Sequence, residues 1–491
     1  MSENNEITTY IGQKGYTIYK DCLEIKEQEF IRDSLSVAPY APKSPVKPEP
    51  FPVYRESKNK FYLPRYFGME HYGKPDEVRL SQGMDIDLKF KGELRDYQKD
   101  IVKKYLDSLN HEIGGGGLLD IPCGFGKTVM ALYIISMVKK KTIIIVNKDF
   151  FTNQWSKSIK TFLPTARIGI IQGPIVDVEN KDVVIAMLQS LSGKEYHKNI
   201  IAQFGLTIVD ECHHISSQYF SRSLFKIVTK YTLGLSATMQ RKDGLTKVFK
   251  MFLGDIICSV KREANDPVLI KCIDFKVNDE EFNETIYDYR GNPAYSSMIT
   301  KICDFNIRSE FIIKVIEKEL KEKEDQQIMV LAQNRSLLKY MFNAISHRNI
   351  ASVGYYVGGM KEKELEKSEN KKVIVATYAM ASEGLDIKTL STLILATPRT
   401  DITQAVGRIL RMKHERPLVV DIIDSHEMFK RQSLKRISFY KKYNYKIIKT
   451  DSDKYFKDIW TEYKYKKKSN GSNNSNCEKK QKKIQKCLIK M

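Results

Sequence analysis

The stretch Ile121-Pro122-Cys123-Gly124-Phe125-Gly126-Lys127-Thr128 decides the fold of this chain. It follows a short apolar run, Leu118–Ile121, that is typical of a β-strand, and it leads into a predicted helix from about Gly126 to Lys139. Successive backbone N–H groups in such a turn, together with the N-terminus of the helix behind it, favour an anion. The sequence therefore predicts a phosphate-binding loop at this place.

Two side chains of this loop have the chemistry that a bound nucleotide needs. Lys127 would reach the β- and γ-phosphates, and the Thr128 hydroxyl would ligate Mg²⁺. The loop departs from the usual pattern at Ile121, which stands where that pattern has its first glycine, so Pro122 and Gly124 would set the turn instead. A glycine-rich turn with a surface lysine is the alternative, but the flanking strand and helix favour the phosphate loop.

A second apolar strand ends in two carboxylates, Asp210 and Glu211. The carboxyl ends of parallel strands meet at one sheet edge, so we expect this pair beside the phosphate loop. Asp210 would hold Mg²⁺ through water, and Glu211 would orient the water that attacks a γ-phosphate. His213 and His214 follow at once, but no Cys or carboxylate has the spacing of a zinc site.

Short apolar runs alternate with helical segments over most of the chain, which is typical of parallel α/β sheets buried on both faces. After the loop the runs are Thr142–Val146, Val183–Met187, Leu206–Val209 and Tyr231–Leu235, and a later set is Ile328–Ala332, Ser352–Val357, Lys372–Thr377, Thr392–Ala396 and Pro417–Ile423. A charged stretch interrupts this rhythm. We therefore expect α/β domains at residues 91–255 and 311–450, with an interdomain connection at 256–310.

The two ends of the chain differ from this pattern. Seven of the fifteen prolines lie between Pro39 and Pro64, which predicts an extended linker within a small accessory domain over residues 1–90. Phe51–Gly68 has aromatic runs around a polar turn, which indicates a hairpin. Residues 451–491 are expected to form a basic tail without fixed structure.

The chain carries 81 Lys and Arg against 60 Asp and Glu, a net charge of +21. This balance favours a polyanionic partner, although a solvated lysine-rich surface is the alternative.

The sequence has no signal peptide and no apolar run near the roughly 20 residues of a membrane span, so no membrane is expected. Its eight cysteines lack paired metal spacing and point to a reducing, intracellular compartment. Cys123 and Cys212 are interpreted as small motif residues, not nucleophiles.

Eight segments together, in this order, resemble the motifs of the superfamily-two helicases and translocases. They are Leu94–Gln98, Ile121–Thr128, Val146–Trp155, Asp210–His213 (DECH), Ser236–Thr238, Met329–Arg335, Ala376–Ile387 and Gln404–Arg411. The resemblance covers about residues 91–450. Within the superfamily, PCGxGK replaces the commoner GxxxxGK opening, and the short length resembles the poxviral transcript-release and phage branch-migration helicases. Arg241-Lys242-Asp243 resembles the Arg-Glu-Asp element of XPB-like helicases, with Lys in place of Glu.

This resemblance implies roles for individual residues. Lys127, Asp210, Glu211, Gln404, Arg408 and Arg411 would be catalytic, the two arginines as arginine fingers. Nucleotide would be held by Arg95, Gln98, Pro122, Cys123, Gly124, Phe125, Gly126, Lys127, Thr128, Gly384 and Asp386. His213, Ser236, Ala237 and Thr238 would couple hydrolysis to strand movement, and Gln154, Trp155, Arg241 and Thr377 would face nucleic acid.

The resemblance also implies an architecture and an activity. We expect two tandem RecA-like domains and a monomeric, ATP- and Mg²⁺-dependent helicase whose ATPase is stimulated by nucleic acid. DNA is favoured over RNA, with 3′→5′ movement, in transcription or branch migration of a large DNA virus. Transcription machinery would be a partner, and the location would be nucleus, cytoplasm or virion. A duplex translocase that never separates strands and a non-catalytic nucleic-acid-binding scaffold stay open as alternatives.

Overall fold

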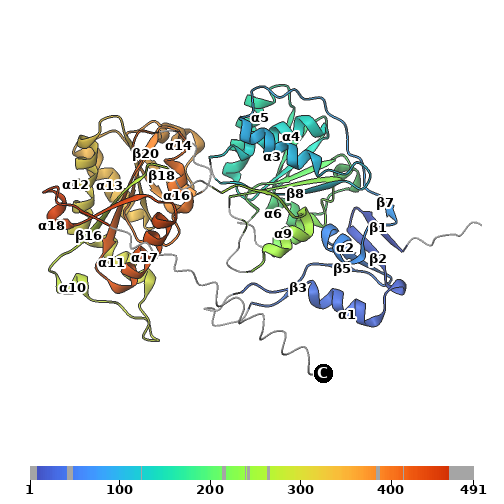
Figure 1. Ribbon diagram of the computed structural model, residues 1–491, viewed down its shortest axis with the longest axis horizontal. Helices are drawn as coiled ribbons and strands as arrows, with labels where there is room; N and C mark the ends of the chain where they lie inside the picture. The colour runs from blue at the N-terminus through green and yellow to red at the C-terminus, as the bar shows by residue number, and fades with distance from the viewer. Residues whose placement is uncertain are drawn as a thin grey trace, which may run out of the picture.

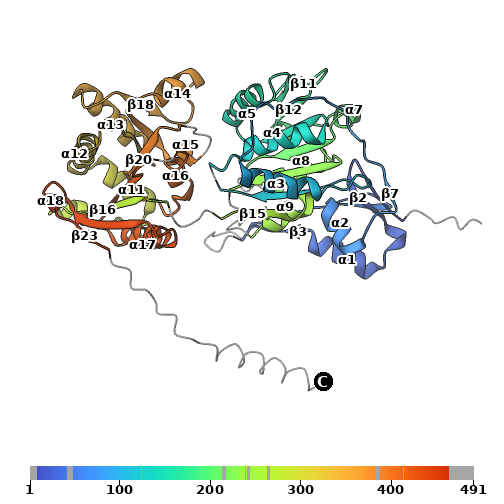
Figure 2. The same cartoon turned by 45° about the horizontal axis from the view of Figure 1, so that its top comes forward.

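The computed structural model describes residues 8–40, 48–122, 124–212, 217–237, 239, 244–261, 266–382, 387–412 and 414–463. These residues form an N-terminal unit and two α/β lobes that lie side by side (Figures 1 and 2). Lobe one comprises the elements between residues 96 and 259, and lobe two those between residues 269 and 462. The predicted α/β class with parallel sheets is confirmed.

Lobe one has an eight-stranded sheet in the order β11-β10-β12-β9-β13-β14-β8-β15, parallel except for the β10–β11 pair. Side chains of β9 alternate between two buried clusters, one on each face of the sheet. Helices α3, α4 and α5 cover one face and α6, α8 and α9 the other. The elements are β8 (Gly115–Asp120), β9 (Thr142–Val146), β10 (Ile168–Gln172), β11 (Ile175–Asp177), β12 (Val183–Met187), β13 (Leu206–Val209), β14 (Tyr231–Ser236), β15 (Ile256–Ser259), α3 (Asp96–Asp107), α4 (Lys127–Val138), α5 (Asp149–Phe162), α6 (Leu188–Gly193), α7 (Lys198–Ile201), α8 (Ser217–Leu224) and α9 (Thr246–Leu253).

Lobe two repeats this construction with the order β18-β19-β17-β20-β21-β16-β22-β23, parallel except for the β22–β23 pair. Its strands are near-continuous apolar runs because both faces are buried. The elements are β16 (Leu269–Phe275), β17 (Gln327–Ala332), β18 (Val353–Tyr356), β19 (Val373–Thr377), β20 (Leu390–Leu395), β21 (Leu418–Asp424), β22 (Lys446–Asp451), β23 (Thr461–Glu462), α10 (Glu280–Asn283), α11 (Tyr295–Asp304), α12 (Asn306–Glu322), α13 (Arg335–His347), α14 (Glu362–Glu369), α15 (Tyr378–Ser382), α16 (Thr403–Arg408), α17 (Glu427–Lys442) and α18 (Ser452–Tyr455).

The structure corrects two predicted boundaries. The connection expected at residues 256–310 is wrong in extent, because β15 pairs with β8 in lobe one and β16 lies between β21 and β22 in lobe two. The tail expected from residue 451 begins too early, because β23 pairs with β22 and Tyr455 is fully buried. Residues 464–491, with the lysine clusters, lie outside the described residues.

The N-terminal unit contains a five-stranded sheet in the order β5-β6-β2-β1-β7. The predicted hairpin is present, because β5 and β6 pair antiparallel. The flanks of the proline-rich stretch pair with each other as β3 and β4, and because residues 41–47 lie outside the described residues, an extended linker there stays a prediction. The elements are β1 (Thr9–Gly12), β2 (Gly15–Tyr19), η1 (Lys20–Cys22), α1 (Ile25–Ser34), β3 (Ser36–Val37), β4 (Phe51–Pro52), β5 (Arg55–Glu56), β6 (Lys60–Leu63), α2 (Arg65–Tyr72) and β7 (Glu77–Val78).

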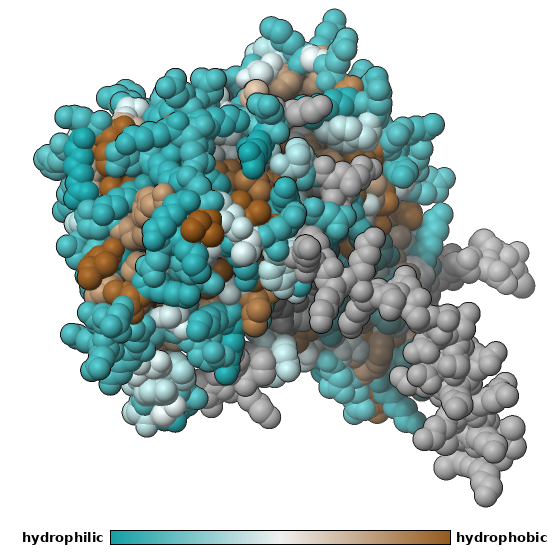
Figure 3. Space-filling model, turned by 60° about the vertical axis from the view of Figure 1, so that its left-hand side comes forward, coloured by the Kyte–Doolittle hydropathy of each residue, from teal (hydrophilic) through white to brown (hydrophobic). Residues whose placement is uncertain are grey.

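The surface shown in Figure 3, with lobe two turned forward, is mostly hydrophilic with scattered apolar spots. Exposed large apolar side chains such as Ile307 and Leu434 are of the kind that soluble surfaces carry singly. Within the described ranges, no helix has both the length and the apolar character needed to cross a bilayer.

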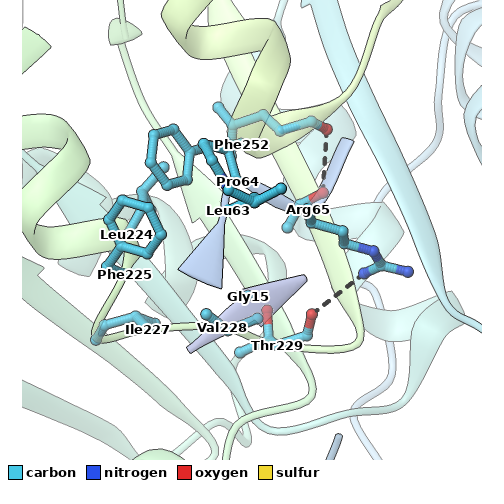
Figure 4. Close-up of a pocket in the computed structure, with 12 residues that line it drawn as sticks. Gly15, Leu63, Pro64, Arg65, Leu224, Phe225, Ile227, Val228, Thr229 and Phe252 are labelled. Atoms are coloured by element: carbon cyan, nitrogen blue, oxygen red, sulfur yellow. Dashed lines mark hydrogen bonds between the residues drawn. The ribbon is translucent and has the colours of Figure 1, made fainter. Parts of the chain in front are cut away.

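The N-terminal unit is docked onto lobe one through a buried cation. Arg65 is 3% exposed, and its Nη1 donates to the carbonyl oxygen of Lys230 at 2.8 Å, just before β14 begins. Figure 4 shows Arg65 beside Thr229, with Leu63 and Pro64 facing Phe252. Val37, Phe51 and Val53 join the same buried cluster as the helices of lobe one. The unit has a buried cluster of its own and is also packed into the lobe-one core through these three residues.

Buried ion pairs fasten the helices of lobe two to its sheet. Arg308 on α12 is 0% exposed, and its Nη2 donates to Asp424 at 2.9 Å and to the carbonyl oxygen of Ala396 at 2.7 Å. Arg436 on α17 donates from Nε to Asp421 at 2.8 Å, and Tyr440 donates to the same carboxylate. Each pair replaces hydration with charge-assisted hydrogen bonds inside the lobe.

We expect Arg308→Met to lower the free energy of unfolding by about 3–5 kcal/mol, because Asp424 would be left as an unpaired buried charge. Urea denaturation followed by circular dichroism measures this loss. The matched control is Arg348→Met, which breaks the pair with Glu310 whose side chains are 47% and 27% exposed. That control should cost under about 1 kcal/mol. Equal losses in the two variants would contradict the role given to burial.

Candidate active site

The phosphate loop stands where β8 ends and α4 begins. Ile121 is fully buried in the lobe-one core, and its N–H donates to the carbonyl oxygen of Ser236 at 2.8 Å. Ile121 directly follows the last residue of β8 and is held against β14 by this hydrogen bond, so no glycine is needed there. Gly124 and Gly126 have φ of +87° and +81°, the left-handed region that favours glycine. A Cβ on Gly126 would also lie 2.3 Å from the Nε2 of Gln98.

Gln98 braces this loop from α3. Its side chain is 4% exposed, its Nε2 donates to the carbonyl oxygen of Phe125 at 2.9 Å, and its Oε1 accepts the N–H of Arg95 at 3.0 Å. Tyr97 donates to the same carbonyl at 3.3 Å. The predicted adenine-reading element thus touches the phosphate loop directly. Contacts of Arg95 and Gln98 with a base remain a prediction.

The acidic pair at the end of β13 lies next to the loop, as expected for parallel strands. Lys127 Nζ and Glu211 Oε1 form an ion pair of 2.9 Å, with side chains only 10% and 14% exposed. Glu211 has a φ of +44°, which is strained for a residue with a side chain. The predicted phosphate-binding cation and the predicted water-orienting carboxylate therefore pair directly with each other.

Asp210 is buried at the centre of this group. Its Oδ1 accepts the N–H of Glu211 at 3.0 Å, and its Oδ2 accepts the indole N–H of Trp155 at 2.8 Å. Burial and the charge of Glu211 raise the pKa of Asp210 to about 6, while Lys127 and the Trp155 hydrogen bond oppose that rise. The environment thus disfavours a bare carboxylate and favours one that is neutralised by a cation.

Trp155 corrects one prediction. The motif resemblance implies that it faces nucleic acid, but it is 1% exposed in the lobe-one core and contacts Asp210 instead. Phe151, Trp155 and Ile159 recur every four residues along α5, the spacing of a core-facing stripe, and that signal could have revealed the burial. Trp155 is therefore a positioning residue for the carboxylate. Gln154 beside it is half-exposed, and its strand-facing role stays a prediction.

The residues present fit Mg²⁺. Asp210 supplies a carboxylate and Thr128, in the first turn of α4, a hydroxyl, which are the hard oxygen donors that this ion prefers. Across the described ranges, no group of three or more His, Cys, Asp or Glu side chains could hold a metal ion by itself. A site that shares its ion with nucleotide phosphates and water matches this donor set. Burial raises the pKa of the Cys212 thiol, in keeping with an inert motif cysteine.

Lobe two reaches the loop through Arg411. A Cβ built on Gly124 would lie 3.7 Å from the Cγ of Arg411, so this arginine, just after α16, lies over the phosphate loop. Lys157 on α5 and Glu366 on α14 form a second contact between the lobes at 3.6 Å. Phe150, at the start of α5, packs against the lobe-two cluster. No local sequence signal marks Phe150, Lys157 or Glu366 as interlobe residues.

The other arginine of this segment has a different setting. Arg408 is 4% exposed, and its Nε donates to the carbonyl oxygen of Ala381 within lobe two at 2.7 Å. The structure thus brings Arg411 to the loop, and a contact of Arg408 with nucleotide remains a prediction.

Gln404 is half-buried on α16. Thr377, at the end of β19, accepts the N–H of Met380 at 3.4 Å.

Ser236 joins the loop to its neighbour strand, since it is fully buried and its carbonyl oxygen accepts the Ile121 N–H. Ala237 follows it and is half-buried. The remaining predicted residues lie outside the described ranges, and their roles stay predictions: Cys123, His213, Thr238, Arg241, Gly384 and Asp386.

Two family models and several viral proteins match the chain. Residues 91–241 match the model of the type III restriction enzyme, res subunit, and residues 311–413 match the helicase conserved C-terminal domain. The chain is 35% identical over 481 residues to the "Putative ATP-dependent RNA helicase L396" of Acanthamoeba polyphaga mimivirus, covering 94% of this chain and 92% of that protein.

Two further relatives are also viral. The "Putative helicase 161L" of Invertebrate iridescent virus 6 is 27% identical over 383 residues, covering 74% of this chain and 85% of that protein. The "Putative ATP-dependent RNA helicase QP509L" of African swine fever virus (isolate Pig/Kenya/KEN-50/1950) is 25% identical over 409 residues, covering 78% and 79%. Among solved structures, "The crystal structure of T4 UvsW" matches with a TM-score of 0.33 and 20% identity, covering 87% of this chain and 96% of that one.

We expect Trp155→Phe to lower the turnover of ATP by about tenfold or more while ATP binding survives. The change leaves the Asp210 carboxylate without its indole donor, and a hydrogen bond to a charged group contributes about 1.5–3 kcal/mol. Steady-state hydrolysis and fluorescent-nucleotide binding measure the two effects. The control is Tyr105→Phe, which removes a buried bond of 2.9 Å to the Thr232 carbonyl and should affect stability but not turnover. Wild-type turnover in Trp155→Phe would remove the residue from this role.

Arg411→Ala should bind nucleotide normally and hydrolyse it about 10³-fold more slowly, because an arginine supplied across a lobe interface stabilises charge in the transition state. Single-turnover hydrolysis at saturating ATP isolates this step. Arg416→Ala, an exposed arginine in the same segment, is the matched control and should hydrolyse at the wild-type rate. If the two variants behave alike, Arg411 does not act at the phosphate loop.

Proposed function

Because this chain belongs to the superfamily-two ATP-dependent helicases, with two RecA-like lobes and ATP hydrolysis as its reaction, we propose that it couples each hydrolysis cycle to movement along nucleic acid and to strand separation. The observation that carries the proposal is the position of Arg411 from lobe two over Gly124 of lobe one. When one nucleotide site is shared by two lobes, binding, hydrolysis and release of the nucleotide would change the distance between the lobes. Repeated changes of that distance would move the protein along a strand.

The residues divide the chemistry among them. Nucleotide phosphates would draw Lys127 away from Glu211, which frees that carboxylate to orient the attacking water. Asp210 and Thr128 would hold Mg²⁺, which neutralises charge on the phosphates when bound. Trp155 and the N–H of Glu211 keep Asp210 aimed at that place. Arg411 would stabilise the γ-phosphate as it leaves, and its retreat after hydrolysis would let the lobes separate.

We propose that Gln154 of lobe one and Thr377 of lobe two contact the strand, one from each lobe. Contacts to backbone phosphates carry no sequence information, so binding should be sequence-independent and should weaken with salt. DNA is our proposed substrate, in transcription or DNA remodelling, on the motif resemblance. RNA is the alternative, since the mimivirus and African swine fever virus relatives are named RNA helicases.

Viral kinship is confirmed by relatives from large DNA viruses. We accordingly propose that the protein works as a monomer beside viral transcription machinery, in the nucleus, cytoplasm or virion. The non-catalytic scaffold is not retained, because the family hydrolyses ATP and this chain has Lys127, Asp210 and Glu211. The duplex translocase stays as the second candidate, since a two-lobed motor also moves along an unopened duplex.

The decisive experiment offers the purified chain labelled forked substrates of DNA and of RNA, each with a 3′ or a 5′ single-stranded tail. We expect ATP-dependent unwinding of the 3′-tailed DNA fork, with ATPase stimulated by the same strand. Glu211→Gln, which should bind ATP without turnover, is the control for ATP-driven separation.

The alternatives have distinct outcomes. Displacement of a third strand from a triplex, with no fork unwound, would favour the duplex translocase. Unwinding confined to RNA forks would overturn the DNA assignment. ATPase that no nucleic acid stimulates would sink the proposed coupling itself.

A further inference from the structure

A trough lies between the N-terminal unit and lobe one, away from the phosphate loop. It consists of two adjacent cavities of about 300 and 370 Å³ that share Arg55, Glu195, Phe225 and Lys226. Its lobe-one wall, α7 and the segment after α8, precedes β13 and β14 in the chain. The trough therefore lies toward the amino ends of the parallel strands, whereas the phosphate loop follows a carboxyl end.

The walls of the trough are fixed in place. Arg65 and the apolar residues around it hold the N-terminal unit on lobe one (Figure 4). The guanidinium of Arg55 lies 5.2 Å from the centre of the Phe225 ring, and its Nη2 donates to the carbonyl oxygen of Arg222 at 3.5 Å. A preformed cleft binds without the entropic cost of ordering its walls.

The charge of the trough is strongly positive. Five cations line it, and its lining contains one acid; the cations are Lys14, Arg55, Lys198, Arg222 and Lys226. Lys226 pairs with Glu195 at 3.0 Å and donates to the carbonyl oxygens of Ser192 and Lys194 at 2.9 Å each. These two charges compensate each other, so the excess of four positive charges comes from the other side chains. That excess suits the phosphates of a polyanion.

Aromatic rings stand among these cations. Tyr10, Tyr62 and Tyr196 line the first cavity as half-buried side chains. Lys14 Nζ lies over the Tyr62 ring, 4.7 Å from its centre, so a cation and an aromatic ring are adjacent in the trough. Tyr196 is anchored by a hydrogen bond of 3.0 Å from its hydroxyl to the Ser190 carbonyl. Basic side chains interleaved with rings are the combination that binds unpaired nucleotides, the rings stacking on bases and the cations holding phosphates.

We propose that this trough is an accessory site for single-stranded nucleic acid, separate from the path across the two lobes. Unpaired bases offer the faces that Tyr62 and Tyr196 can stack on, whereas a duplex hides them. Cavities of this size each suit one small ligand, so the trough would hold about two nucleotides. The inference deepens the proposed function and rests on it, because a strand must already be the substrate of the motor.

The test compares the full-length Lys14→Gln/Tyr62→Leu variant with a matched control, Lys103→Gln/Tyr289→Leu. Lys103 is exposed on α3 and Tyr289 is 88% exposed, and neither lines the trough, so both double variants lose one charge and one ring. Fluorescence anisotropy measures binding of labelled oligo(dT) and oligo(rU) of about twelve nucleotides, within the range of site sizes known for single-strand binders, and of a duplex of the same length, over a range of salt.

We expect the trough variant to bind the single strands about tenfold more weakly, because it loses a ring on which a base would stack. Its salt slope should fall by about 0.7, because Lys14→Gln removes a cation that would neutralise one phosphate. Duplex affinity, ATPase without nucleic acid and ATPase at saturating strand should match the control. Cross-linking of an oligonucleotide that carries 5-iodouracil to the wild-type chain, mapped by mass spectrometry, should label the peptides of Tyr62 or Tyr196.

Wild-type single-strand affinity in the trough variant would overturn the proposal, and so would cross-links confined to the two lobes outside the trough. An equal loss of duplex and single-strand binding would overturn the single-strand assignment. Failure of the proposed function gives a different result, since nucleic acid would then not stimulate the ATPase of the wild-type chain.

Discussion

Parallel pairing of β13, β14 and β8 is the constraint on which the site depends. Val209 pairs with Gly234, and Ser236 pairs with Asp120, so these strands end at one edge of the sheet. The phosphate loop is therefore in direct contact with the acidic pair and with the Ser236 segment. A shift of the loop reaches Ser236 through one backbone hydrogen bond and Glu211 through one ion pair.

Much of this arrangement could be predicted from the sequence, because strands buried on both faces appear as apolar runs and because the chemistry stands at strand ends. The boundaries could not. Leu269–Phe275 lies in a stretch that looks like a connection, and its place between β21 and β22 is set by pairing partners far away in the chain. Tyr455 falls within the expected tail because its partner Glu319, to which it donates, lies well over a hundred residues earlier.

Alternation explains which aromatic residues of the N-terminal hairpin remain accessible. Phe61 and Leu63 on β6 point into the core and are fully buried, whereas Tyr62 between them lines the trough. The aromatic and basic residues that alternate along the hairpin suggest a single exposed surface. Because successive side chains of a strand point to opposite faces, these residues are divided between the core and the trough. Arg65 illustrates the same limit, since a basic residue that resembles a phosphate contact is instead enclosed by backbone carbonyls.

The buried Arg65 seam has a consequence for how forces pass through the molecule. With Val37, Phe51 and Val53 inside the lobe-one core, the N-terminal unit and the phosphate loop form a single frame of reference, and in the proposed motor lobe two would be the body that moves against it. In that proposed motor, a strand bound by the N-terminal unit would stay at a fixed distance from the nucleotide throughout a cycle. Its distance from Thr377 would change with every closure of the lobes, so the tension in a strand bound at both places would follow the occupancy of the nucleotide site.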